Sequence, residues 1–282
     1  MFAYSTLVLT VLVLYLLGLR RRAPAMHGGA VTPMPKSAQY DDEISIGSYN
    51  IHRCKGVDGR RCLKRIGAQL GHMSFAGLYE VEGPLPWLQA DQAHRLGRLL
   101  GMAAVFAPVQ WRWFSYNRGN AFLSRLPVER WYQEPLVDST GTHPRCLVTV
   151  WLRLGRESVP VLMTHLARNA DLDIQLQTVL ERFRSYPRAI LMGDFNVPPD
   201  HPRLQALIDA GAAVDALADP RGAGCRHERI DGILLRGLTL CGGGNSPTGP
   251  SDHPCYWVRV RNPGLATAPV RIPAAPGLAV MR

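Results

Sequence analysis

The chain has 282 residues, of which 46% are hydrophobic, so it can bury a sizeable core and a wholly disordered chain is excluded. Its formal net charge is +10, and residues 1–39 hold four basic and no acidic side chains, which leaves +6 for the rest. A moderately basic surface favours an anionic partner such as a phosphate ester, a nucleic acid or an anionic lipid headgroup, without choosing among them.

The first predicted element is the uncharged apolar run over residues 2–19, which is followed at once by three arginines. In a helix this run spans about 27 Å, close to the roughly 30 Å hydrocarbon core of a bilayer. Residues 1–22 are therefore predicted to form a single-pass transmembrane anchor. Because the positive charge lies after the run, the positive-inside rule predicts an inner (cytoplasmic) membrane protein whose folded body faces the cytosol.

Two alternatives to this anchor stay open. The segment "APAMHGGA" could hold a signal-peptide cleavage site, or translation could begin at Met26 or Met34, so that the apolar run is never made. The six cysteines form no CxxC pair and are interpreted as free thiols of a reducing compartment, although an even number is also compatible with disulfides.

Residues 23–43, which follow the three arginines and contain several prolines and glycines, are predicted to be a linker. Strands are then predicted at "ISIGSYNI", "FAGLYEV", "AAVFAPV", "NAFLSRL", "RCLVTVWLRL", "VPVLMTHL", "RAILMGDF", "ERIDGILL" and "HPCYWVRV", and helices at "GRRCLKRIGAQLGH", "PWLQADQAHRLGRLLGM", "LDIQLQTVLERFRSY" and "PRLQALIDAG". This order predicts one α/β domain over residues 44–261, with mixed sheets covered by helices. The stretch "CGGGNSPTGPSD" is expected to be flexible, and the tail, residues 262–282, to be disordered.

Polar side chains recur at the points where the predicted strands end. Taken singly, each has a structural explanation, such as turn formation by Asn50 or an ion pair between Asp231 and Arg229. Taken together, four carboxylates, two histidines and two amides at strand ends indicate a ligand site. Carboxylate and amide oxygens suit Mg²⁺ or Mn²⁺, and an aspartate beside a histidine suits an oriented general base. The pattern therefore indicates a metal-dependent phosphoester hydrolase. The side chains are Asn50, Glu80, His165, Asp194, Asn196, Asp231, Asp252 and His253.

The segments "SYNIH", "GLYEV", "GNAFLSR", "MTHL", "GDFN", "RIDGILL" and "SDHP", in this order, resemble the endonuclease/exonuclease/phosphatase superfamily of DNase I-like proteins. The resemblance covers about residues 44–260 and is closest to small bacterial members; GDFN and SDH are its most specific parts. It implies a four-layer α/β/β/α sandwich of two mixed β-sheets flanked by helices. The family commonly has glutamine before its metal-binding glutamate, whereas Tyr79 stands here, which puts the support of that ligand in doubt.

The resemblance implies a metal site and a substrate site. Glu80 and Asn50 would hold Mg²⁺ (or Mn²⁺), with Asp252 nearby. Asn120, in "GNAFLSR", would contact substrate. Arg145 would reach a phosphate, or else be an ordinary surface arginine.

The resemblance also implies a catalytic set. His253 would act as general base on the attacking water and would be oriented by Asp231. Asp194 and Asn196 would position that water and bind the phosphoryl group. His165 would donate a hydrogen bond to a phosphate oxygen as negative charge builds.

Three functions stay open at this point. The first is a membrane-anchored, metal-dependent phosphoesterase acting on phosphodiester or phosphomonoester bonds of phospholipid-type or small phosphate esters. The second is a DNase I-like nuclease, and the third is a non-catalytic membrane-tethered binding module. The loop "VQWRWFSYNRGN" contains four aromatic residues between arginines, which could stack on bases, enter a lipid interface or pack between the sheets. The apolar N-terminus favours the first function, and no oligomeric state is predicted.

Overall fold

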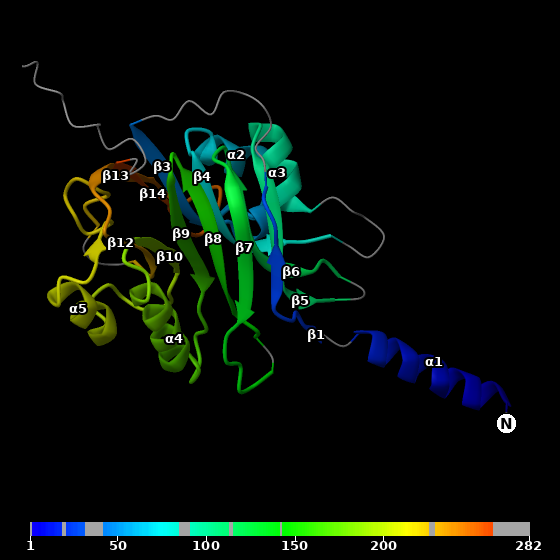
Figure 1. Cartoon of the computed structure of the whole chain (residues 1–282). Helices are drawn as coiled ribbons and strands as arrows, with labels where there is room; N and C mark the ends of the chain where they lie inside the picture. Colours follow the sequence, from blue (N-terminus) through cyan, green and yellow to red (C-terminus); the bar gives the residue numbers. More distant parts are fainter. Residues whose placement is uncertain are drawn as a thin grey trace, which may run out of the picture.

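The computed structural model of the chain describes residues 2–18, 21–31, 42–84, 91–112, 115–141, 143–225 and 229–261. Two mixed seven-stranded sheets pack face to face and carry helices on both outer faces (Figure 1). The predicted α/β/β/α sandwich is therefore confirmed.

The first sheet consists of β1 (Arg21–Arg22), β3 (Glu43–Asn50), β4 (Phe75–Glu82), β5 (Ala103–Trp111), β6 (Arg118–Ser124), β13 (Leu240–Ser246) and β14 (Cys255–Arg261). Its order is β1-β5-β6-β4-β3-β14-β13, and only the central pair β3–β4 is parallel. The outer face is covered by α2 (Leu63–Leu70) and α3 (Gln92–Leu100), which bury Ile66 and Leu96 against it.

The second sheet consists of β2 (Met26–Gly28), β7 (Val128–Pro135), β8 (Cys146–Leu154), β9 (Glu157–His165), β10 (Ala189–Asp194), β11 (Val214–Asp215) and β12 (Asp231–Arg236). Its order is β11-β12-β10-β9-β8-β7-β2, with β9–β10 as the parallel pair. The outer face is covered by α4 (Leu172–Arg184) and α5 (Pro202–Asp209), which bury Leu176 and Leu204 there.

The main core lies between the two sheets, where alternate side chains of the facing strands meet. Phe75 and Phe122 stack there with ring centroids 5.9 Å apart. Tyr79 also points into this core, and its hydroxyl lies 3.4 Å from Oγ of Ser48. The residue that replaces the expected glutamine therefore packs between the sheets and does not reach into the site.

The N-terminal segment corrects the expected linker. β1 pairs with β5 at the edge of the first sheet, β2 pairs with β7 at the edge of the second, and Val31 bridges to Val128. Residues 21–31 thus form a strap that protects one edge of each sheet. These pairings are too short for a sequence pattern to predict them; residues 32–41 lie outside the described part of the chain.

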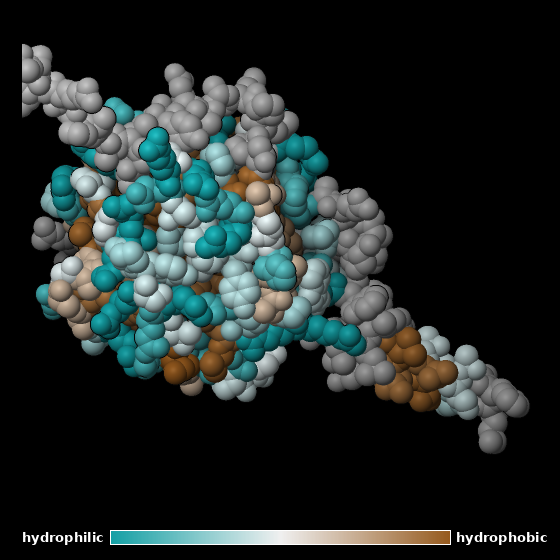
Figure 2. Space-filling model, in the orientation of Figure 1, coloured by the Kyte–Doolittle hydropathy of each residue, from teal (hydrophilic) through white to brown (hydrophobic). Residues whose placement is uncertain are grey.

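Helix α1 (Phe2–Gly18) precedes the strap and projects away from the sandwich (Figure 1). Residues 4–13 are all exposed, and Figure 2 shows apolar surface on this helix apart from the body. Among the residues that the structure describes, no helix has the length and apolar character needed to cross a membrane. The single-pass span expected over residues 1–22 stays a prediction.

Two further expectations about elements were wrong. The first half of the expected flexible stretch, "CGGGNS", belongs to β13, where a side chain on Gly244 would come 2.9 Å from the Trp257 ring. Glycine here serves close packing, which a sequence pattern does not distinguish from flexibility. Strand β7 was missed because charged residues interrupt its apolar positions. The tail, residues 262–282, lies outside the described residues.

Candidate active site

Strand ends from both sheets meet at one end of the sandwich. Asn50 ends β3 and Glu80 lies near the end of β4, while His165 and Asp194 end the parallel strands β9 and β10. Nδ2 of Asn50 donates to Oδ2 of Asp194 at 3.0 Å, and this hydrogen bond joins the two sheets. Asp231 begins β12 directly opposite Asp194 in the ladder. The topology therefore collects the predicted site residues from distant parts of the chain.

His253 and Asp231 form the expected pair. Nδ1 of His253 lies 2.8 Å from Oδ2 of Asp231, and Nε2 lies 3.7 Å from Oδ2 of Asp194. The backbone N–H of His253 donates to Oγ of Ser251, whose hydroxyl donates to the carbonyl oxygen of Asn50 at 2.7 Å. These bonds fix the loop and direct Nε2 toward the centre of the site.

Burial and charge set the protonation of this group. Burial raises the pKa of Asp194, and the neighbouring charge of Asp231 raises it further. Burial likewise raises the pKa of Asp231. Burial alone would lower the pKa of His253, but the hydrogen bond to Asp231 and its charge outweigh this and raise that pKa to about 9.

His165 has the opposite shift. Its Nε2 lies 3.3 Å from Oδ2 of Asp194, and the ring is buried. Burial, with the charges of Arg145 and His253, holds the pKa of His165 well below its usual value. The ring is neutral near pH 7, so it can donate a hydrogen bond but supplies no positive charge.

Two sets of residues fit a divalent cation. Ligand atoms of Asp194, Asp231 and His253 lie within 4.8 Å of one another, and Oδ1 of Asp231 is buried with no hydrogen-bond partner. Glu80 offers a second place for a cation. Within the described residues no salt bridge joins its carboxylate to a basic side chain, so the carboxylate is available as a ligand. Its Oε1 lies 3.5 Å from Nδ2 of Asn50. The carboxylate oxygens in these two places are hard donors, which suit Mg²⁺ or Mn²⁺.

A backbone irregularity presents Glu80 to the site. The ladder between β4 and β6 shifts register between Leu78 and Val81, and Glu80 has φ 54°. A non-glycine residue in the left-handed region is strained and is held there by its surroundings. The bulge keeps Tyr79 in the core while it directs Glu80 outward.

The other two predicted metal ligands, Asn50 and Asp252, make contacts with protein groups in this structure. Asn50 directs its nitrogen at both carboxylates, and its Oδ1 already accepts from the backbone N–H of His52 at 3.1 Å. In this arrangement Asn50 bridges Glu80 and Asp194 through its carboxamide nitrogen. Asp252 is half exposed and lies 3.3 Å from Nδ1 of His52; no described contact joins it to Glu80.

Asn196 also contacts protein groups in this structure. Its Oδ1 accepts from Nε of Arg168 at 2.7 Å, and its Nδ2 donates to the carbonyl oxygen of Leu166 at 2.8 Å. The carboxamide is thus occupied by the protein, and it holds Arg168 at the rim near Asp194. In the sequence, only the position of Arg168 three residues after His165 points to it.

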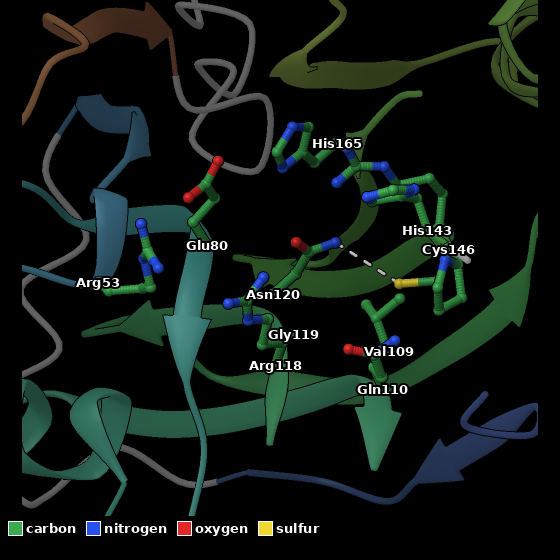
Figure 3. Close-up of a pocket in the computed structure, with 12 residues that line it drawn as sticks. Arg53, Glu80, Val109, Gln110, Arg118, Gly119, Asn120, His143, Cys146 and His165 are labelled. Carbon is green, nitrogen blue, oxygen red and sulfur yellow. Dashed lines mark hydrogen bonds between the residues drawn. The ribbon is translucent and has the colours of Figure 1, made fainter. Parts of the chain in front are cut away.

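A cavity of about 230 Å³ adjoins this group. Glu80 and His165 line it together with Asn120 and Arg145, the two predicted substrate contacts (Figure 3). Nδ2 of Asn120 lies 3.5 Å from Sγ of Cys146, and burial lowers the pKa of Arg145. Of the predicted catalytic residues, His165 lines the cavity.

The aromatic loop beside the site is only partly described. Trp111 and Tyr116 are exposed, at 36% and 41%, while Trp113 and Phe114 lie outside the described residues. The exposed pair does not pack between the sheets.

A family model described as the Endonuclease/Exonuclease/phosphatase family matches residues 47–253. The chain belongs to this family. Its members are phosphoester hydrolases, so the chain is a hydrolase of that class, and the expected family is confirmed. No curated protein matches the chain.

Solved structures share the fold of this family member. An endonuclease/exonuclease/phosphatase from Beutenbergia cavernae DSM 12333 has 23% identity and a TM-score of 0.64, covering 79% of this chain and 72% of that one. A family protein from Leptotrichia buccalis C-1013-b has 15% identity and a TM-score of 0.61, covering 78% and 99%. D. rerio TDP2, complexed with a single-strand DNA product, has 15% identity and a TM-score of 0.57, covering 78% and 100%. At these identities the likeness concerns the fold alone.

Proposed function

We propose that the protein is a Mg²⁺- or Mn²⁺-dependent phosphodiesterase or phosphatase that uses water as the nucleophile. The observation that supports this most strongly is the buried His253–Asp231 pair, whose free imidazole nitrogen points toward Asp194 beside the cavity. A histidine that is hydrogen-bonded at Nδ1 and open at Nε2 has the geometry of a general base.

In this mechanism a water lies in line with the scissile P–O bond, and Nε2 of His253 takes its proton. Asp231 holds Nδ1 and stabilises the imidazolium that results. Asp194 positions the water, and neutral His165 donates to a phosphate oxygen. Arg145 binds the phosphate from the cavity wall.

A divalent cation would neutralise phosphate charge as a Lewis acid when bound. Glu80 would hold it, with Asn50 fixing the carboxylate; the group of Asp194, Asp231 and His253 is the second candidate. Since His253 has a raised pKa without the cation, a nearby positive charge would favour the neutral form that a base requires.

The proposed substrates are phospholipid-type or small phosphate esters. This rests on α1, whose exposed and mostly apolar residues 4–13 fit a membrane surface at the cytosolic side of the inner membrane. A nuclease is the alternative, since the shared fold includes a protein bound to single-strand DNA product. A membrane-tethered binding module is the third reading, and the preserved His253–Asp231 geometry disfavours it.

The test uses the full chain with Mg²⁺ or Mn²⁺ on bis-p-nitrophenyl phosphate, supercoiled plasmid and a phospholipid panel, with EDTA as the metal-free control. Metal-dependent turnover of the lipids or the small ester is expected. Plasmid cleavage alone would favour the nuclease, and no turnover of any substrate would contradict the proposal. Flotation with anionic vesicles tests the membrane contact: a chain lacking residues 1–18 should no longer float.

A further inference from the structure

The exposed helix α1 leaves the sandwich at the same end as the cavity. β5 runs in the same direction as β4, since both are antiparallel to β6, so its last residue, Trp111, lies at the end where β4 presents Glu80. Arg21 is the partner of Trp111 in the ladder between β1 and β5. Because α1 ends at Gly18, three positions before Arg21, it leaves the body beside the end of β5 (Figure 1).

The loop after β5 holds two exposed aromatic side chains, those of Trp111 and Tyr116. Oδ1 of the buried Asn117 accepts from the backbone N–H of Arg112 at 2.7 Å, which closes the loop. The backbone carbonyl of Asn117 accepts from the N–H of Gly83 at 2.8 Å, which fixes the loop to the end of β4. The two rings are therefore presented at the surface by a loop with defined anchor points.

A second loop brings an aliphatic side chain to this end. β7 runs in the same direction as β9, since both are antiparallel to β8, and the loop after β7 leads to Arg145 in the cavity wall. Val137 lies in this loop and is exposed. The guanidinium of Arg22 donates to the carbonyl oxygen of Leu136, so the strap ties this loop to the edge that carries Trp111. Exposed apolar side chains thus lie at the cavity end of both sheets, close to the point where α1 leaves.

These features suit a bilayer better than a nucleic acid. Stacking on bases would use the aromatic rings but neither the aliphatic Val137 nor the apolar α1. Tryptophan and tyrosine are typical of the membrane interface, where the body of the ring meets lipid and its polar tip meets water. Arg21 is exposed beside Trp111 and adds positive charge that complements anionic headgroups.

We propose that Trp111, Tyr116 and Val137 form an apolar rim that contacts an anionic bilayer and turns the cavity toward the lipid headgroups. α1 attaches the chain to the membrane, and the apolar rim orients the folded body on it. The proposal rests on the proposed phosphoesterase function and names a phosphate ester held in the bilayer as its substrate class. A soluble ester reaches the cavity whatever the orientation of the body, so the apolar rim matters only for the bilayer-held ester.

Fluorescence quenching tests the contact itself and requires no turnover. The full chain is mixed with phosphatidylglycerol vesicles whose acyl chains carry bromine, which quenches tryptophan emission at short range. Trp111→Phe should lose part of the quenching, because this ring enters the interface. Trp151→Phe is the matched control and should keep it, since that ring packs on Tyr186, which precedes the start of β10 and lies at the opposite end of the sandwich. Quenching that Trp111→Phe leaves unchanged would overturn the contact.

Two esters with the same reactive group test the orientation. p-Nitrophenyl hexadecyl phosphate is held in phosphatidylglycerol vesicles, and p-nitrophenyl methyl phosphate stays in solution. Trp111→Ala and Tyr116→Ala should each lower kcat/KM about tenfold for the vesicle-held ester, because the apolar contact is lost, and leave it unchanged for the soluble ester. Tyr132→Ala, a similarly exposed tyrosine within β7, is the matched control and should change neither value.

The outcomes separate the apolar rim from the proposed chemistry. Equal loss on both esters, or no loss on either, would overturn the orienting role. Loss confined to cleavage of a single-stranded oligonucleotide would assign the aromatic loop to base stacking and overturn it as well. Absence of turnover of both esters by the unchanged chain would overturn the phosphoesterase function, while the quenching result would still decide the membrane contact.

Discussion

At the scale of single residues, the contact between Asp231 and His253 sets the charge of the imidazole. Their 2.8 Å separation is the main reason that the pKa of His253 reaches about 9 despite burial. Asp231→Asn keeps the shape but removes the charge, so this pKa should fall toward the ordinary value of about 6.5. NMR titration of His253 in the metal-free protein measures it; a value that stays near 9 would contradict the assigned cause.

Glu80 provides the second prediction at this scale. Its carboxylate lacks a salt bridge among the described residues, so Glu80→Gln should raise the Mg²⁺ concentration for half-maximal rate by about tenfold or more. Calorimetric titration of Mg²⁺ gives an independent reading. If Asp231→Asn weakens metal binding while Glu80→Gln does not, the ion belongs to the buried Asp194–Asp231–His253 group instead.

The sequence could predict which residues lie together in the site, but not how the carboxamides of Asn50 and Asn196 are oriented there. The pairing of His253 with Asp231 is what the resemblance to the family implies. The orientation of Asn50 depends on the N–H of His52, and that of Asn196 depends on Arg168 and Leu166. These contacts depend on turns in which His52 and Asn196 have positive φ values, and no local sequence pattern predicts such values.

At the scale of elements, Gly193 allows β9 and β10 to lie close enough to bring His165 and Asp194 together. A Cβ on Gly193 would come 2.1 Å from the carbonyl oxygen of Thr164, which is backbone and cannot turn aside. Gly193→Ala should therefore lower the melting temperature by several degrees and reduce turnover. Gly29→Ala, where a Cβ would meet nothing within 4 Å, is the control. Equal melting temperatures for both variants would contradict this packing argument.

The start of α3 provides a pH-dependent prediction. Oδ1 of Asp91 accepts from the backbone N–H of His94 at 2.7 Å, and its Oδ2 lies 2.7 Å from Nδ1 of that histidine. This contact raises the pKa of His94, although partial burial opposes it. Because the pKa of His94 is higher in the folded state, the contact contributes its full stabilisation below about pH 6.5. This stabilisation is lost as the pH rises through the folded-state pKa.

Asp91→Asn keeps a cap acceptor and removes the charge. It should therefore cost more stability at pH 5.5 than at pH 9, by about 0.5 kcal/mol or less, because half of the His94 side chain is exposed. Urea unfolding at the two pH values measures the difference, and a larger cost at pH 9 would refute the linkage.

At the scale of the whole molecule, the strap over residues 21–31 makes the N-terminus part of the sandwich. Removal of residues 1–18 takes away only α1 and should leave the melting temperature within a degree or two. Removal of residues 1–31 exposes one edge of each sheet and removes the hydrogen bond from Arg22 to the carbonyl oxygen of Leu136. This deletion should lower the melting temperature by several degrees. Thermal unfolding of the two truncated chains tests this; equal stability would show that the strap is dispensable.

The layers of the sandwich could be predicted because each long strand and helix has its own apolar periodicity. The strap and β13 could not be predicted, because short or glycine-rich strands are stabilised by pairing with another strand. The local sequence does not show which strand that is.

The most direct test of the central claim is turnover of bis-p-nitrophenyl phosphate by His253→Ala with Mg²⁺ or Mn²⁺. If Nε2 of His253 takes the proton of the attacking water, kcat should fall by about 10²–10⁴ while the melting temperature stays close to that of the unchanged chain. A stable variant that keeps near-normal kcat would contradict the proposed active site.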